Sequence, residues 1–475
     1  MTQNTVEIIS PIDGSIYATR ALNTANEVDS CLTQATAAQA LWQDTPLETR
    51  ADFVLRALDI IDQQRSEIAL ELAWQMGRPV RYGDGEVNGF LERGRHMVSI
   101  AESALQNIYP DPQDGFERYI ERRPLGVVLV VAAWNYPYLI AVNSIVPALM
   151  AGNCVVLKHS GQTLLSGERL VAAFHAAARD MGLPQALQDG LITCLHLDHG
   201  ATAKTVGDAR IAHVNFTGSV SGGHAIVAAA KDRFIGLGLE LGGKDPAYVR
   251  ADADLDATAE ALVDGSFFNS GQSCCGIERI YVEASVQDAL VERMCALTKD
   301  YVLGTPLDEA TTMGPMVRTQ AADMVRQQIN DALSQGAKAC LEESHFAASQ
   351  IGTPYLAPQI LTHVTHDMEI MREESFGPVV GIMAVADDAE AIARMNDSVY
   401  GLTASVWTKD AKAAKAIGAK VQTGTFFMNR CDYLDPGLAW TGIGDTGRGA
   451  SLSQIGYEQL TRPMSFHLKT GNEYA

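Results

Sequence analysis

The chain contains one long stretch without a charged residue, and this stretch limits what the chain can fold into. It runs from residue 125 to residue 154, which exceeds the usual length of a membrane-spanning helix. The apolar run is interrupted by polar residues and prolines, including Asn135, Asn143, Pro137 and Pro147. We therefore expect a buried strand over "LGVVLVVAAW", then a loop, then a buried helix over "LIAVNSIVPALMAG", and no membrane span.

Apolar strands alternate with helices along this part of the chain. The expected strands cover residues 126–132, 153–158, 191–195 and 211–216. Such alternation predicts a parallel sheet with crossover helices, and hence an α/β fold. A second α/β stretch begins near Asp245 and continues to residue 440.

A helical layer precedes the first sheet. Residues 24–42 and 46–76 have the periodicity of amphipathic helices. Thr45, Pro46 and Glu48 predict a capping-box start for the second of these helices.

Two further segments alternate like strands but have no core of their own. They cover residues 116–124 and 462–470. We expect the second segment to pair either with another subunit or with the first segment.

Composition excludes several classes of protein. A chain of 475 residues predicts two or three substructures, and a formal charge of -21 argues against nucleic acid or an anionic membrane as the main partner. Eight cysteines without a Cys-x-x-Cys pair fit a reducing compartment and give no metal-binding motif. The N-terminus has no basic start followed by an apolar core, so we expect a cytoplasmic protein.

Two segments carry residues suited to covalent catalysis on a carbonyl. Cys274 lies in "FFNSGQSCCGIER", where small residues after an apolar run can present a thiol as a nucleophile. Glu240 lies upstream in "LELGGKDP" and is a candidate base, although an isolated glutamate there also suits a strand end at the surface. Asn135 is a candidate oxyanion donor or simply a turn residue before Pro137.

Seven segments in order resemble the aldehyde dehydrogenase superfamily across nearly the whole chain. They are "AAWNYP", "VVLKHS", "FTGSVSGG", "LELGGKDP", "FFNSGQSCC", "EESFGPV" and "GDTGRG". The resemblance implies a Rossmann-like dinucleotide-binding domain, an α/β catalytic domain and a small β oligomerisation flap. We place the first in residues 1–105 and 125–240, the second in 241–440, and the arm and tail in 106–124 and 441–475. Members usually form homodimers or homotetramers.

The resemblance also implies roles for the catalytic candidates. Cys274 attacks an aldehyde, and Asn135 with the backbone N–H of Cys274 binds the oxyanion. Glu240 activates the water that hydrolyses the thioester, which favours hydrolytic members over coenzyme A-acylating ones. Ser451 stands where many relatives have a glutamate that assists this water, and we assign no role to Cys275.

The expected cofactor is NAD or NADP. Gly218 and Ser219 follow a strand and open a helix, where backbone can approach a pyrophosphate. By resemblance, further cofactor contacts come from Trp134, Lys158, Leu241, Glu374 and Phe376. Many strictly NAD-dependent relatives have a glutamate at the position of Gly161, so we expect NADP to be tolerated, with His159 as a candidate phosphate partner.

The substrate side is the least determined part of the sequence. Four positions match the substrate pocket of relatives, namely Tyr136, Asn143, Phe268 and Trp440. Relatives that oxidise succinic semialdehyde commonly have arginines at two of these positions, but here they are Asn143 and Phe268, which disfavours that substrate. The aromatic residues suit a medium-size apolar or aromatic aldehyde, or alternatively an amino or betaine aldehyde.

Two other features bear on function. Asp432 and Asp435 add negative charge near the expected pocket mouth, whereas Arg430 opposes it. A scaffold without catalytic activity is the competing hypothesis, and the presence of the full catalytic set disfavours it.

Overall fold

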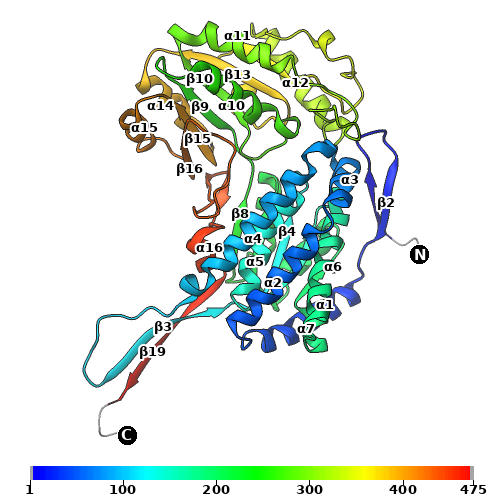
Figure 1. The fold of residues 1–475 in the computed structure, drawn as a ribbon, viewed down its shortest axis with the longest axis vertical. Helices are drawn as coiled ribbons and strands as arrows, with labels where there is room; N and C mark the ends of the chain where they lie inside the picture. Colours follow the sequence, from blue (N-terminus) through cyan, green and yellow to red (C-terminus); the bar gives the residue numbers. More distant parts are fainter. Residues whose placement is uncertain (1–3, 471–475) are drawn as a thin grey trace.

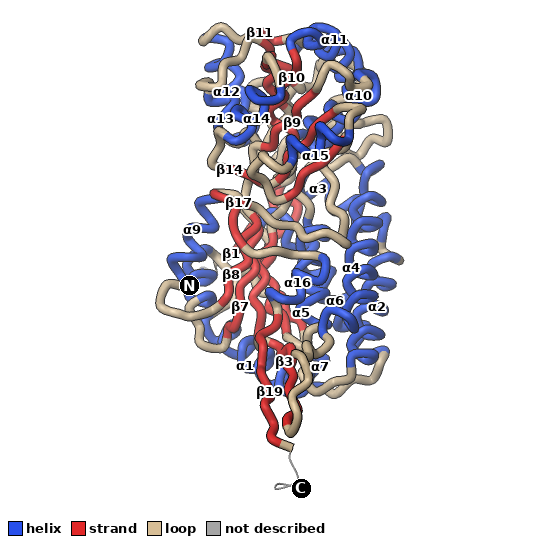
Figure 2. Tube along the Cα trace, turned by 90° about the vertical axis from the view of Figure 1, so that its left-hand side faces the viewer, coloured by secondary structure: helices blue, strands red, loops and turns tan. Residues whose placement is uncertain are grey.

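The computed structural model describes residues 4–470. Two α/β units lie one above the other along the long axis, and a two-stranded arm extends from the lower unit (Figure 1). Helices cover both faces of the lower sheet, which Figure 2 shows edge-on between α9 on one side and α4, α5 and α6 on the other. The catalytic candidates lie where the two units meet.

The lower sheet has the strand order β18-β8-β7-β4-β5-β6. Its strands are β4 (Val127–Ala132), β5 (Cys154–His159), β6 (Ile192–Cys194), β7 (Ile211–Thr217), β8 (Gly236–Glu240) and β18 (Gly447–Arg448). All pair in parallel except β18, which is antiparallel to β8. The connecting helices are α5 (Pro137–Met150), α6 (Leu164–Asp180), α7 (Gln185–Gly190), α8 (His199–Val206) and α9 (Val220–Ala229). The four strands expected from the first sheet region are thus confirmed, with ends shifted by a residue or so.

The uncharged stretch forms β4 and α5, as the sequence predicted. All six residues of β4 are buried, because it lies in the middle of the sheet with helices on both faces. The helix α5 starts with Pro137, and its first turn is capped by the Glu86 carboxylate, which accepts hydrogen bonds from the backbone N–H groups of Tyr138 and Leu139. Within residues 4–470, no helix has the length and apolar character needed to cross a membrane.

The helical layer differs from the sequence expectation at one junction. Its helices are α1 (Ala25–Trp42), α2 (Leu47–Asp62), α3 (Arg65–Met76) and α4 (Gly83–Leu105). The single helix expected over 46–76 is two helices, and the capping box expected at Thr45 is wrong. The Thr45 hydroxyl instead donates to the carbonyl of Leu41. The capping box lies one helix earlier, between Thr24 and Glu27.

The upper sheet has the strand order β11-β12-β13-β10-β9-β15-β16. Its strands are β9 (Asp245–Val249), β10 (Ile277–Glu283), β11 (Lys338–Ala339), β12 (Gln359–Thr362), β13 (Val379–Val385), β15 (Thr403–Trp407) and β16 (Thr425–Met428). Its helices are α10 (Leu255–Phe267), α11 (Gln287–Thr298), α12 (Thr319–Ser334), α13 (Glu369–Arg372), α14 (Asp388–Asn396) and α15 (Ala411–Gly418). The pairing is parallel except for β11.

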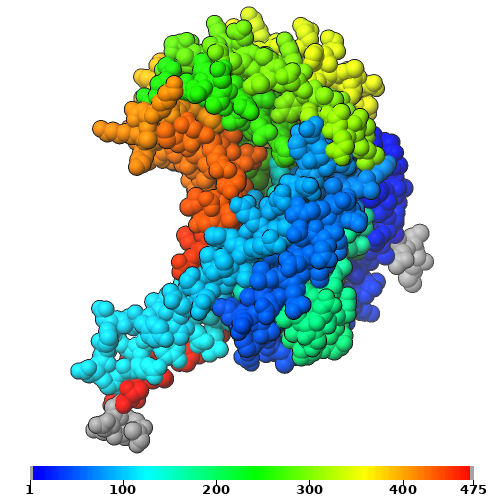
Figure 3. Space-filling model, viewed as in Figure 1, coloured from blue at the N-terminus to red at the C-terminus, as the bar shows by residue number. Residues whose placement is uncertain are grey.

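The arm consists of β3 (Phe116–Pro124) paired with β19 (Thr461–Lys469) in one antiparallel ribbon. Tyr119 stacks on Phe466 across the ribbon at a ring separation of 4.6 Å. The arm stands clear of the body in the space-filling view (Figure 3). Of the two pairings that the sequence left open for the C-terminal strand, the structure has the one with residues 116–124.

The remaining elements are short. They are the N-terminal hairpin β1 (Thr5–Ile9) and β2 (Ile16–Ala21), the two-stranded pair β14 (Tyr400–Gly401) and β17 (Ile443–Gly444), and α16 (Ser453–Gln459). Single 3-10 turns are η1 (Val80–Tyr82), η2 (Gly161–Thr163), η3 (Phe268–Gly271), η4 (Ala284–Val286) and η5 (Glu343–His345).

Candidate active site

Cys274 lies in the turn between η3 and β10, at the boundary of two cavities. Asn269 and Ser270 both have left-handed backbone conformations, with φ of 53° and 56°. Such conformations are strained for residues other than glycine, and they cluster at functional sites. Gly271 is also left-handed, and a Cβ there would collide with the backbone of Gly377. The tight turn against this loop places the half-buried thiol between a cavity of about 270 Å³ and one of about 440 Å³.

The smaller cavity brings together most of the predicted cofactor residues. Six of them line it with Cys274, namely Trp134, Gly218, Ser219, Leu241, Glu374 and Phe376. Ser219 is the N-cap of α9, and its hydroxyl accepts a hydrogen bond from the N–H of Gly222 at 3.1 Å. The positive end of this helix therefore faces the cavity, where it suits a pyrophosphate.

The glycines near α9 have a packing role that the sequence did not indicate. A Cβ on Gly218 or Gly222 would lie 2.7 or 2.6 Å from the ring of Phe216. A Cβ on Gly223 would lie 2.8 Å from the side chain of Leu241. A larger residue at these positions would displace the Phe216 or Leu241 side chain, because α9 packs closely on the sheet, apart from any ligand.

The loop that carries Glu374 and Phe376 is held by a buried ion pair. The Lys244 ammonium lies 2.5 Å from the Glu278 carboxylate, which accepts the backbone N–H groups of Ser375 and Phe376 at 2.8 and 2.9 Å. Phe376 has a left-handed φ of 49° and meets Trp134 edge to face at 5.6 Å. The two rings thus form an aromatic corner of the cavity near Cys274.

The Glu374 carboxyl is held differently. It accepts the N–H of Gly243 at 2.9 Å. Burial, and then the nearby Glu278 carboxylate, raise the pKa of Glu374 to about 8. At neutral pH this carboxyl therefore mostly keeps its proton and can both donate and accept hydrogen bonds.

Of two expectations about the ribose end, the structure contradicts one, whereas the role of Lys158 stays a prediction. Lys158 does not line the cavity that contains Cys274. The assignment of His159 as a phosphate partner is wrong, because its Nε2 lies 3.2 Å from the carbonyl of Pro137 and its Nδ1 lies 3.1 Å from the Thr163 hydroxyl. Burial also lowers the pKa of His159 to about 4, so the ring is neutral at pH 7.

The larger cavity brings together all four predicted substrate residues. Tyr136, Asn143, Phe268 and Trp440 line it together with Cys274 and Glu240. Tyr82, which the sequence did not indicate, meets Phe268 edge to face at 5.1 Å. The thiol of Cys274 is thus reached from an aromatic-walled cavity.

Cys275 also lines this cavity, contrary to the expectation that its side chain points elsewhere. That expectation assumed strand geometry, in which neighbouring side chains alternate, whereas residues 272–276 form a turn. The Cys275 thiol lies 2.9 Å from the Asp432 carboxylate, which also accepts the Ser273 hydroxyl at 3.2 Å. Asp432 is therefore bound within the wall of the cavity.

Asn135 is buried and lines the smaller cavity together with Cys274. Its side-chain amide donates to the carbonyl of Gln272 at 3.2 Å, and its own carbonyl accepts Arg78 at 2.6 Å. Arg78 is in turn paired with Glu86, and both side chains are buried. This pair fixes the loop of Asn135 relative to α4, because a buried ion pair tolerates little displacement.

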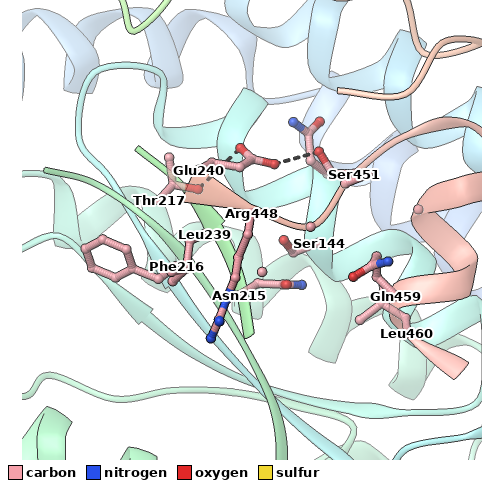
Figure 4. Close-up of a pocket in the computed structure, with 15 residues that line it drawn as sticks. Ser144, Asn215, Phe216, Thr217, Leu239, Glu240, Arg448, Ser451, Gln459 and Leu460 are labelled. Carbon is pink, nitrogen blue, oxygen red and sulfur yellow. Dashed lines mark hydrogen bonds between the residues drawn. The ribbon is translucent and has the colours of Figure 1, made fainter. Parts of the chain in front are cut away.

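Glu240 ends β8 and lies on the substrate side of Cys274. Its carboxylate accepts the Ser451 hydroxyl at 2.6 Å and lies 3.5 Å from the Thr217 hydroxyl (Figure 4). Burial raises the pKa of Glu240, while Ser451, Arg93 and Thr217 each act to lower it. Behind the carboxylate is a small cavity of about 20 Å³, which is enough for one water molecule.

Sequence reasoning missed several charged groups of the larger cavity. They are Arg78, Glu86, Glu92 and Arg93 near or on α4, and Asp264 on α10. These residues lie on helices whose sequences show only amphipathic periodicity. No local motif marks them, and only packing brings them to the cavity.

A thiol at the boundary of a cofactor-sized cavity and an aromatic cavity, with a carboxylate beside it, is an arrangement that suits an oxidoreductase with a covalent thiol intermediate. The chain matches the model of the aldehyde dehydrogenase family over residues 1–466. It therefore belongs to the aldehyde dehydrogenase family, whose members oxidise aldehydes with NAD or NADP.

Individual relatives cover almost the whole chain. An aldehyde dehydrogenase of Paenarthrobacter nicotinovorans is 34% identical over 465 residues, with 96% of this chain and 98% of the relative covered. The succinate semialdehyde dehydrogenase [NAD(P)+] Sad of Escherichia coli K12 is 31% identical over 459 residues, with 95% of each chain covered. The solved succinic semialdehyde dehydrogenase of Streptococcus pyogenes in complex with NADP+ is 28% identical with a TM-score of 0.90, and 98% of this chain and 100% of that chain are covered.

Proposed function

We propose that the protein oxidises an aldehyde to a carboxylic acid through a thioester on Cys274. The position of Cys274 carries this proposal, since its thiol borders both cavities and can meet an aldehyde from one side and a nicotinamide from the other. The thiolate sulfur attacks the carbonyl carbon to form a thiohemiacetal. Bound NAD(P)+ supplies the acceptor for the hydride that leaves this carbon.

Asn135 and the backbone N–H of Cys274 are the proposed donors to the oxyanion. The Asn135 amide is held on the turn of Cys274 by its bond to Gln272, so a small rotation redirects it toward the thiohemiacetal. Loss of one such donor typically raises the barrier by about 3 kcal/mol.

Glu240 is the proposed base for the second half of the reaction. It borders the cavity of the thiol and is bound by Ser451 on its other side. Its carboxylate takes a proton from water as the water attacks the thioester, which releases the acid and the Cys274 thiolate. Ser451, which occupies the position of a glutamate in many relatives, supports the base as a hydrogen-bond donor.

The larger cavity best fits an aldehyde whose remaining part is apolar or aromatic and of medium size. Tyr136, Phe268 and Trp440 provide the wall for it. Asp264 and Glu92 also line the cavity and favour the alternative of a cationic aldehyde, but both residues are exposed. Water screens exposed charges, so we give the apolar body precedence.

The cofactor side of the structure is consistent with both NAD and NADP. The helix N-terminus at Ser219 and the neutral Glu374 suit groups that the two cofactors share. Gly161 brings no carboxylate to repel a 2′-phosphate, so we expect NADP to be used. Measurement of kcat/KM for both cofactors tests this, and a preference for NAD above about a hundredfold, some 2.7 kcal/mol, would contradict it.

The arm of β3 and β19 supports assembly into a homodimer or homotetramer. Its ribbon projects from the body and exposes Met464 and Leu468, and extended edges of this kind commonly pair between subunits. The eight free cysteines support a reducing, cytoplasmic setting.

A pair of neighbouring substitutions tests the assignment of the thiol. We expect Cys274→Ser to lower kcat/KM for aldehydes by about 10⁴-fold or more, since a serine hydroxyl without a base is a poor nucleophile. Cys275→Ser removes the adjacent thiol and should retain activity within about tenfold. Equal losses in the two variants, measured by formation of reduced cofactor, would contradict the assignment.

A further inference from the structure

Arg93 is a buried cation on the wall of the larger cavity. It lies on α4, its residue exposure is 8%, and it lines the same cavity as Cys274 and Glu240. Its Nη1 donates to the carbonyl of Leu139 at 3.0 Å and lies 3.4 Å from the side-chain oxygen of Asn143. The other two guanidinium nitrogens, Nε and Nη2, have no hydrogen-bond partner among residues 4–470.

This lack of a partner distinguishes Arg93 from the other deeply buried cations near the site. Arg78 is paired with Glu86, and Lys244 is paired with Glu278. Arg93 forms no ion pair within the described part of the chain. A guanidinium stays charged even where burial lowers its pKa. A buried charge without a direct counterion is unfavourable, so an anion that reaches it binds strongly.

The acidic residues of the cavity do not neutralise Arg93 by contact. Asp264 and Glu92 are exposed, so solvent weakens their effect. Asp432 is engaged by Ser273 and Cys275. Glu240 and Glu86 act on Arg93 only through space and are bound by other partners. The guanidinium of Arg93 therefore has no carboxylate in contact among the described residues, and its remaining N–H groups are available to a ligand.

We propose that Arg93 binds a carboxylate at the far end of the substrate, so that the preferred substrate is an ω-oxo carboxylic acid. This rests on the function proposed above and adds the end group to it. The N–H groups on Nε and Nη2 of Arg93 lie in one plane, and this geometry matches the two oxygens of a carboxylate. A dianionic phosphate suits the site less, because only one unpaired cation faces it and exposed acids line the same cavity.

The expectation that succinic semialdehyde is disfavoured rested on positions 143 and 268, and neither position has an arginine. The structure instead brings a guanidinium from α4 into contact with the Asn143 side chain. The positive charge near position 143 thus comes from Arg93 on α4 and not from α5 itself. The apolar chain of the substrate lies against the aromatic wall of the cavity.

The test compares aldehydes of equal length with different end groups. We expect wild-type kcat/KM for 4-oxobutanoate to exceed that for butanal by about a hundredfold, which is the scale of a charge-assisted contact. 4-Aminobutanal and glyceraldehyde 3-phosphate should be poorer than 4-oxobutanoate. A wild-type preference for butanal, for the amino aldehyde or for the phosphate ester would overturn the proposal. Oxidation of these aldehydes would still support the proposed function, whereas no oxidation of any aldehyde would contradict it.

Substitutions then connect the preference to Arg93. We expect Arg93→Met to reduce the ratio of 4-oxobutanoate to butanal activity to about one, through a rise in KM for 4-oxobutanoate, and Arg93→Lys to retain part of it. Arg95→Met is the matched control, because Arg95 is exposed on the same helix and pairs with Asp59; its ratio should be unchanged. If Arg93→Met lowers both activities equally, Arg93 is a structural residue and the proposal fails. If Arg93→Met does not fold, the comparison of aldehydes with the wild-type enzyme and the activity ratio of Arg93→Lys still test the proposal.

Discussion

The two sides of Cys274 each present a glutamate, and the neighbours that act on the pKa of the two glutamates differ. Glu374 on the cofactor side accepts one backbone N–H and lies near the Glu278 carboxylate, which together with burial raises its pKa to about 8. The pKa of Glu240 on the substrate side is also raised by burial, but Ser451, Arg93 and Thr217 oppose that rise. The proposed base thus has neighbours that stabilise its ionised form, whereas Glu374 has a neighbouring carboxylate that stabilises its protonated form.

This difference shows how neighbours assign roles within one active site. A like charge near Glu374 favours its proton, whereas hydroxyl donors and a cation near Glu240 favour its ionised form. Three substitutions test this comparison of Glu240 with Glu374, and their expected effects decrease from the first to the third.

Glu240→Gln should have the largest effect. An amide cannot accept the proton of the attacking water, so we expect kcat to fall by about 10³-fold, within the range typical of a lost general base. The first turnover should still release one equivalent of reduced cofactor per active site, because acylation of Cys274 does not use this base. Rapid-mixing absorbance measurements distinguish the two phases. Full steady-state turnover by the variant would make the assignment wrong.

Ser451→Ala should shift a pH profile rather than abolish activity. The hydroxyl lowers the pKa of Glu240 by donating to it at 2.6 Å. Without this bond the pKa rises, so the acid limb of the kcat profile should move to higher pH. Ser144→Ala is the matched control, since Ser144 lines the same small cavity but is not a hydrogen-bond partner of Glu240. Identical profiles for Ser451→Ala and wild type would contradict the role of Ser451.

Glu374→Gln should have the smallest effect on cofactor binding. At pH 7 the carboxyl of Glu374 is mostly protonated and resembles an amide, so we expect the dissociation constant for NAD(P)+ to change by only about threefold. Fluorescence titration at pH 7 measures it. A loss of affinity above about a hundredfold would show that the ionised carboxylate is required.

The same variant also tests the pKa through stability. The folded protein keeps a proton on Glu374 that the unfolded chain releases above about pH 4.5, so this group makes the protein less stable as the pH rises toward 8. Glu374→Gln removes this loss of stability, so the Tm of the variant should rise relative to that of wild type as the pH increases from 5 to 8. An equal pH dependence of Tm in both proteins would show that the pKa of Glu374 is not raised.

The predictable part of the site consists of residues in short continuous motifs. Glu240 ends a strand, Gly218 and Ser219 lie between a strand and a helix, and Cys274 lies in a small-residue turn before a strand, so local sequence indicated their position at the edges of the sheets. Trp134 and Phe376 entered through the resemblance to a family, and the structure places both at one cavity. Sequence alone would assign Phe376 to the core.

The misplaced residues depend on long-range packing. The expected capping box at Thr45 was wrong because its hydroxyl found the carbonyl of Leu41 at the end of the preceding helix. The His159 interpretation was wrong because packing against Pro137 and Thr163 occupies both ring nitrogens. In each case the residue has the chemical group that the prediction needed, but in the folded chain this group forms a hydrogen bond with a different residue.

The sequence by itself determined the α/β class and the family, and it indicated a candidate nucleophile and a candidate base, because these depend on periodicity and on residues close together in the chain. Only the tertiary structure decided which charges face the cavity. Arg93 lies far from Cys274 along the chain, and the packing of α4 on α5 brings its guanidinium to the cavity without a counterion among residues 4–470. Charge pairing between distant elements has no local signature, so the end group of the substrate is determined by the fold.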